Sequence, residues 1–92
     1  MARLSEEEID DKLAAMEGWE RDGNAITKEF DNGDFKGSVD FVNRMTPDAE
    51  EMNHYPDLEI SWATVTVTLS SPSEGGLTAD DFELAAKIDA SA

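Results

Sequence analysis

The sequence contains no cysteine, a single histidine and only seven basic residues among its 92. Without cysteine, disulfide bonds, thiolate zinc sites and thiol nucleophiles are all excluded. The lone histidine, His54, cannot form a metal centre of several imidazoles. Seven Lys and Arg against 22 Asp and Glu leave no cluster of cations for a phosphate backbone or an anionic lipid surface. We therefore expect neither nucleic acid nor a membrane as a partner.

Long apolar stretches are absent as well. No segment approaches the roughly 20 apolar residues that cross a bilayer, and the N-terminal sequence MARLSEEEID lacks the apolar core of a signal peptide. The sequence therefore predicts a cytoplasmic protein. Its length predicts one domain over residues 1–92, and domains this small often gain stability by self-association.

Negative charge is present in excess, with a formal net charge of −15. The acidic residues are spread along the chain with apolar positions between them, which is typical of a folded domain. Such a surface indicates a halophilic protein, because high salt screens the repulsion between like charges. A surface for cations or for a basic partner is the alternative, although no calcium-loop spacing of the DxDxDG type occurs.

The first part of the chain predicts a helix followed by a β-hairpin. Ser5 with Glu8 fits a capping box, so a helix is expected over 6–16. Two short strands over 19–21 and 25–30 flank an Asp-Gly-Asn turn, which is the sequence signature of a hairpin.

The rest of the chain predicts two helices around one long strand. Apolar residues recur at helical spacing over 35–45, and a helical segment follows through Pro47, which either starts a new helix or kinks a continuing one. Residues 58–70 alternate like a strand, and Thr78 fits the N-cap of a last helix. The fold class is therefore α+β in the order α-β-β-α-β-α, with helices packed on one face of an antiparallel sheet.

His54 is the candidate for proton transfer, because histidine is the side chain suited to acid–base chemistry near neutral pH. It follows a helix and precedes the strongest strand, at a kind of junction that often borders a cleft. Glu50, four residues earlier, is expected to orient the ring. A structural or exposed histidine is one alternative, and a metal site with Glu50 or Glu51 is another that this spacing supports only weakly. We predict no metal site.

Gly75-Gly76 precedes the last helix, where exposed backbone amides are able to bind an anion. The pair fits neither a P-loop nor a dinucleotide fingerprint, and a tight turn is the alternative interpretation. The serines of Ser70-Ser71-Pro72-Ser73 match no nucleophile elbow and are expected in a solvated loop.

These segments also match a longer pattern. An acidic residue, a histidine four positions later, a proline two further on and a later aromatic residue are present as Glu50, His54, Pro56 and Trp62. Further matches are Gly18-Trp19, Ala25-Ile26, the strand with Val65, Val67 and Leu69, Gly75-Gly76-Leu77-Thr78 and Asp81 to Ala85. In this combination, over nearly its full length, the chain resembles the pterin-4a-carbinolamine dehydratase (4a-hydroxytetrahydrobiopterin dehydratase) family.

The resemblance implies dehydration of a 4a-hydroxytetrahydropterin to quinonoid dihydropterin, as in recycling of a tetrahydrobiopterin-type cofactor. The pterin is then the substrate, and no separate cofactor is implied. His54 is expected as the main proton-transfer residue, with Glu50 and Tyr55 as its catalytic partners. The residues expected to bind the substrate are Pro56, Trp62, Ser71 and Asp81. The resemblance also implies a homodimer or homotetramer with the sheet extended across subunits.

The chain departs from the family at two of its three histidines. Tyr55 stands at the second and Pro72 at the third, and Asn53 replaces an acidic residue before the first. A phenol is a poor acid at neutral pH, and each missing acid–base group typically costs ~10²–10⁴ in rate. The alternatives are therefore a non-catalytic member that binds a pterin or a protein partner, and a distinct activity in the same pocket.

Overall fold

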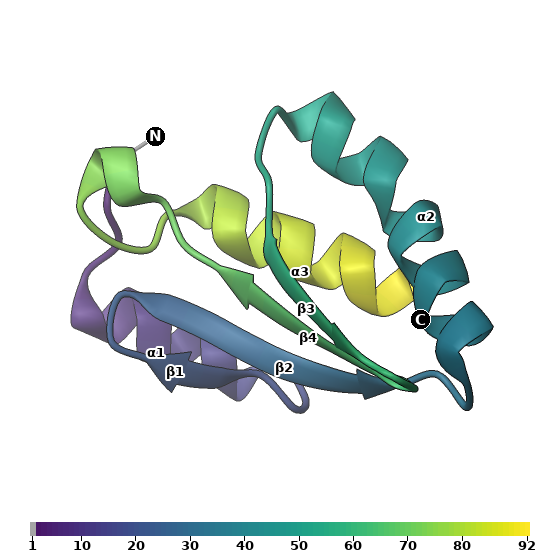
Figure 1. The fold of residues 1–92 in the computed structure, drawn as a ribbon. Helices are drawn as coiled ribbons and strands as arrows, with labels where there is room; N and C mark the ends of the chain where they lie inside the picture. The colour runs from purple at the N-terminus through teal and green to yellow at the C-terminus, as the bar shows by residue number, and fades with distance from the viewer. Residues whose placement is uncertain (1) are drawn as a thin grey trace.

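A computed structural model describes residues 2–92 of the chain. Within them, helices cover one face of a four-stranded antiparallel sheet (Figure 1), which confirms the predicted fold class. The elements are α1 (Glu6–Ala14), β1 (Glu20–Asp22), β2 (Ala25–Asp31), α2 (Phe35–Met52), β3 (Asp57–Ser61), β4 (Thr64–Leu69), the short 3-10 helix η1 (Pro72–Glu74) and α3 (Ala79–Ser91).

The strand expected over 58–70 is in fact two strands joined by a tight turn. Trp62 has a φ of 49°, and with Ala63 it reverses the chain so that Ser61 pairs with Thr64. This turn was not predicted from the sequence, because neither Trp62 nor Ala63 is one of the residue types common in turns. The element order is therefore α-β-β-α-β-β-α, and the strands lie side by side as β1-β2-β4-β3.

One hydrophobic cluster fills the space between the sheet and the helices. In the β2–β4 pairing, Ile26 lies opposite Leu69 and Phe30 opposite Val65, so all four side chains point to the same face. The cluster is completed by Ile9, Trp19, Phe41, Met45, Val67, Leu77, Phe82, Leu84, Ala85 and Ile88. The outward face carries threonines and acidic residues, with no helix from the described part of the chain over it.

Helix α2 is continuous through Pro47, which lies inside it on an exposed position. The helix ends at Asn53, whose left-handed backbone (φ 50°) forms the C-cap. No helix within residues 2–92 has the length and apolar character needed to span a membrane.

Candidate active site

His54 is positioned by the end of α2. The Asn53 cap turns the chain, and the backbone N–H of His54 still donates to the Ala49 carbonyl at 3.1 Å. The imidazole therefore leaves the helix axis and lies against the first turn of α3. Its side chain is only 16 % exposed.

The imidazole is held by the buried carboxylate of Asp81. Nε2 of His54 lies 2.6 Å from Oδ1 of Asp81. The other oxygen, Oδ2, accepts hydrogen bonds from the Ser71 hydroxyl at 2.8 Å and from the backbone N–H of Thr78 at 2.9 Å. Asp81 is fully buried, so its carboxylate is not hydrated. The hydrogen bonds from the imidazole, the Ser71 hydroxyl and the Thr78 N–H replace the lost bonds to water.

The contact with Asp81 also determines which ring nitrogen is available. A carboxylate beside Nε2 favours the tautomer with its proton on Nε2, which leaves the lone pair on Nδ1. Nδ1 has no hydrogen-bond partner within residues 2–92. An imidazole held in this way by a carboxylate is able to accept a proton at its free nitrogen and to release it again.

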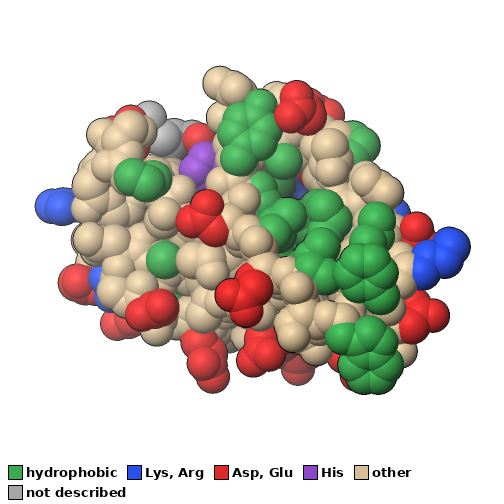
Figure 2. Space-filling model, in the orientation of Figure 1, with side chains coloured by type: hydrophobic (Ala, Val, Ile, Leu, Met, Phe, Trp, Pro, Cys, Tyr) green, Lys and Arg blue, Asp and Glu red, His purple; other side chains and the backbone are tan. Residues whose placement is uncertain are grey.

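A hollow of about 350 Å³ opens beside the imidazole. It lies between the residues that follow α2, including Tyr55, and the loop that follows β4, including Pro72. Figure 2 shows part of the histidine surface, in purple, exposed on this side of the molecule. The volume is within the range of sites that bind small molecules.

The structure brings four of the predicted site residues together, although not all in the predicted positions. His54 and Tyr55 border the hollow, and Tyr55 is 54 % exposed. Ser71 also borders it, but its hydroxyl is bonded to Asp81 and Thr78. Asp81 has no exposed surface, so it lies behind the histidine and contacts no ligand in this conformation.

Two other predicted residues neither bond the imidazole nor line the hollow beside it. Glu50 is exposed, and the carboxylate that bonds His54 is that of Asp81. The expectation for Glu50 assumed that four residues along a helix place two side chains on one face, but α2 ends at Met52, before His54. Pro56 is half-buried immediately before β3.

Trp62 lies at the other end of β3 from His54. Its side chain is 72 % exposed, and its carbonyl accepts a hydrogen bond from Ser38 near the start of α2. A five-residue strand spans roughly 17 Å, so the structure does not bring Trp62 and His54 of one chain to the same small ligand. The expectation for Trp62 rested on the family pattern, and its role in substrate binding stays a prediction.

Sequence reasoning missed the support that Thr78 and Asp80 give to this site. Thr78 was predicted as a helix cap, which is confirmed, but its N–H also bonds the carboxylate that holds His54. Asp80 lines the hollow beside the imidazole. The available signal was the spacing of Thr78 and Asp81, since a carboxylate three residues after an N-cap turns back toward the cap.

Comparison with known proteins identifies the family to which the sequence is similar. The sequence profile described as Pterin 4 alpha carbinolamine dehydratase matches residues 2–91. A protein of Sulfurisphaera tokodaii, provisionally named as a pterin-4-alpha-carbinolamine dehydratase, is 46 % identical over 89 residues, which cover 97 % of this chain and 96 % of that protein. A protein of Roseiflexus castenholzii with the same provisional name is 43 % identical over 88 residues, covering 96 % and 95 %.

Solved structures agree with this result. The crystal structure of a transcriptional coactivator/pterin dehydratase from Brucella melitensis matches with a TM-score of 0.93 and 35 % identity, covering 98 % of both chains. A pterin dehydratase-like protein identified as a RuBisCO assembly factor in the alpha-carboxysome matches with a TM-score of 0.63 and 20 % identity, over 79 % of this chain and 84 % of that one, which shows the fold alone. From its sequence over residues 2–91 and from its fold, the chain belongs to the pterin-4a-carbinolamine dehydratase family.

Proposed function

We propose that the protein dehydrates a 4a-hydroxytetrahydropterin to the quinonoid dihydropterin, in the recycling of a tetrahydrobiopterin-type cofactor. The observation that carries this proposal is the pairing of His54 with a buried carboxylate at a hollow of ligand size. The family supplies the class of reaction, and the site supplies a group able to move the proton.

The reaction removes a proton from N5 and a hydroxide from C4a, which forms the C4a–N5 double bond and releases water. Nδ1 of His54 accepts the N5 proton, and the imidazolium that forms is stabilised by Asp81 through Nε2. The same imidazolium then delivers the proton to the departing hydroxyl. One residue thus serves both steps, provided that the two atoms of the substrate lie within its reach.

Tyr55 is a supporting donor in this scheme. Its ring is at the rim of the hollow, and its hydroxyl donates a long hydrogen bond of 3.4 Å to Oδ1 of Asn53. A phenolic O–H that is so weakly engaged is free to turn and donate to the departing hydroxyl. Pro72 offers no side-chain hydrogen bond, so it acts only on the shape of the hollow.

A stopped-flow assay on freshly generated 4a-hydroxytetrahydropterin tests the proposal. His54→Gln keeps an N–H that bonds Asp81 but removes the proton acceptor, and we expect the rate above background to fall by ~10²–10⁴. Glu59→Gln, on the outward face of β3, is the matched control and should leave the rate unchanged. A wild-type protein that gives no rate above the uncatalysed reaction would refute the proposal.

A non-catalytic role in binding a pterin or a protein partner is the second candidate. It is favoured by Tyr55 and Pro72, which stand where the family pattern has histidines. One protein of this fold is identified as a RuBisCO assembly factor, so the fold alone does not specify dehydration. In calorimetry, pterin binding without turnover indicates a binding protein, and no pterin binding favours a protein partner.

We further propose that the chain forms a homodimer or homotetramer through β3. This strand is at the edge of the sheet and is exposed along its length. Leu58 and Ile60 pair with Val67 and Val65, so they point toward the helix side of the sheet. Together with Phe35, Val39 and Trp62 they form an exposed apolar area, called here the β3 edge patch, which is the main green region of Figure 2.

A further inference from the structure

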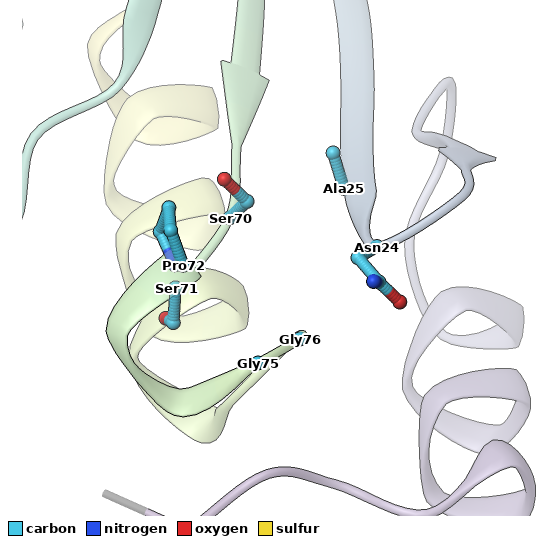
Figure 3. A pocket seen from close by; sticks show the side chains of 7 residues that line it. All are labelled: Asn24, Ala25, Ser70, Ser71, Pro72, Gly75 and Gly76. Carbon is cyan, nitrogen blue, oxygen red and sulfur yellow. The ribbon is translucent and has the colours of Figure 1, made fainter.

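A second hollow adjoins the one beside His54. It measures about 290 Å³ and lies between the start of β2 and the loop after β4. In Figure 3, Asn24 and Ala25 line one side of it, and Ser70 and Pro72 line the other. Both hollows are lined by Ser70, Ser71 and Pro72, so they border the same loop. The reacting atoms belong to the pterin ring, which needs only the hollow at His54.

A third hollow, of about 240 Å³, lies next to the second. It shares Asn24 and Gly76 with the second hollow, and it is lined by Arg3 and Arg21. These are two of only seven basic residues in a chain with a net charge of −15. Arg21 is engaged in an ion pair by Glu6, which also lines this hollow. Arg3 makes no ion pair with any other residue in 2–92 and interacts with Glu6 only at longer range, so that the pKa of this carboxyl is lowered mainly by Arg21 and to a smaller degree by Arg3.

Arg3 lies against the Gly75-Gly76 turn because Gly76 has no side chain. A Cβ added to Gly76 would be 2.7 Å from Cδ of Arg3, closer than the two atoms tolerate. A Cβ added to Gly75 would be 3.8 Å from Nη1 of Arg3, so the guanidinium lies close to this turn, whose two glycines line the second hollow while Arg3 itself lines the third. An arginine that lines such a hollow and makes no ion pair is suited to a phosphate or a carboxylate.

The hollow beside His54 and the third hollow differ in the charges that line them. Asp80 lines the hollow beside His54, and Arg3 lines the third hollow. A pterin ring presents its 2-amino group and N3–H as donors, which suit a carboxylate, whereas an anionic group would be repelled at that end. The charges therefore favour one orientation, with the ring at His54 and an anion at Arg3.

We propose that the three hollows form one extended site for a reduced pterin whose C6 substituent ends in a phosphate or a carboxylate. The ring lies beside His54, the substituent passes Pro72 and the second hollow, and the anion pairs with Arg3. The placement of the ring rests on the proposed function. The placement of the anion rests on Arg3, the glycine turn and the charge difference along the site.

Calorimetry with stable oxidised pterins tests the placement of the anion. Neopterin triphosphate should bind the wild-type protein about tenfold more tightly than neopterin, as expected for one charge-assisted contact. Arg3→Gln should abolish this preference, and Gly76→Ala should reduce it because the added Cβ displaces the arginine. Lys12→Gln removes the same unit of charge from a different hollow and should leave the preference intact.

Pteroylglutamate compared with unsubstituted pterin provides the carboxylate arm of the test. Tighter binding of the anionic ligand in either comparison, if it is lost in Arg3→Gln, supports the extended site. The comparison that shows it identifies the anion as a phosphate or a carboxylate. Equal binding of neopterin and its triphosphate, together with equal binding of pteroylglutamate and pterin, overturns the extended site, as does a preference that survives Arg3→Gln. In both cases dehydration at His54 would still stand. If none of the pterins binds, the extended site fails, and the stopped-flow rate on 4a-hydroxytetrahydropterin decides separately whether dehydration at His54 stands.

Discussion

At the scale of single residues, Asp81 connects the proposed proton-transfer residue, His54, to the folding of α3. Its carboxylate bonds His54 through one oxygen, and through the other it bonds Ser71 and the N–H of the Thr78 helix cap. The carboxylate that orients the imidazole thus also stabilises the first turn of α3. A substitution here is expected to change both activity and stability.

Asp81→Asn tests this double role. An amide offers only one acceptor oxygen, so at least one of the three buried donors loses its partner, at a cost of about 1–3 kcal/mol in the free energy of unfolding. Since Asp81 is buried and does not contact the substrate, we expect kcat to fall ~10–100-fold, as for other groups that orient a catalytic imidazole, with little change in KM.

Urea denaturation and stopped-flow kinetics supply the two measurements for Asp81→Asn. Glu83→Gln, an exposed change on the same helix, should alter neither quantity. An unchanged kcat in Asp81→Asn would contradict the orienting role, even if the protein were less stable.

His54 could be singled out from the sequence as a candidate, but its carboxylate partner could not. His54 stands out because it is the only imidazole of the chain. Its partner is 27 residues away in sequence and reaches it only because α3 packs against the end of α2. Local spacing pointed instead to Glu50, since a sequence pattern records neighbours along the chain and not those brought together by packing.

At the scale of elements, prediction succeeded where the signal was local. The capping box of Ser5 and Glu8 is present as expected, because both hydrogen bonds are made within one turn. The β3–β4 turn was missed because Trp62 and Ala63 give no local sign of a reversal. That turn is held from outside by Ser38, whose hydroxyl donates to the Trp62 carbonyl at 2.8 Å.

The edge position of β3 leads to a prediction about assembly. Ile60→Lys places a charge in the β3 edge patch, and we expect sedimentation velocity to show a shift toward the monomer, because the charge would be buried without a partner. Ser61→Lys adds the same charge at the neighbouring position, where the side chain points to the outward face of the sheet, and should leave the assembly unchanged. A wild-type protein that sediments as a monomer at micromolar concentrations would contradict the proposed interface.

At the scale of the whole molecule, the dominant property is the net charge of −15. The outward face of the sheet contributes to it, since Glu29 of β2 and Glu59 of β3 are both exposed there, each opposite Thr66 of β4. Like charges at this density oppose the compact state unless salt screens them.

We therefore expect the urea midpoint to rise between 0.1 and 1 M KCl, over which the Debye length falls from roughly 10 Å to 3 Å. A variant with Glu20, Glu29 and Glu59 changed to Gln should be more stable at low salt and should respond less to KCl. A midpoint that stays constant or falls with salt would contradict the halophilic interpretation of the composition.

The turn between β3 and β4 places one of the two tryptophans in solvent while the other is in the core, so their fluorescence reports on two different regions of the molecule. Trp62 at this turn is 72 % exposed, whereas Trp19 in the core is 5 % exposed and donates from its indole Nε1 to Asp89 at 3.0 Å. Their fluorescence differs accordingly, with emission at longer wavelength from the solvated indole. Burial of Trp62 against a second copy shifts its emission to the blue, while unfolding shifts that of Trp19 to the red. Association and unfolding therefore move the spectrum in opposite directions, without any added label.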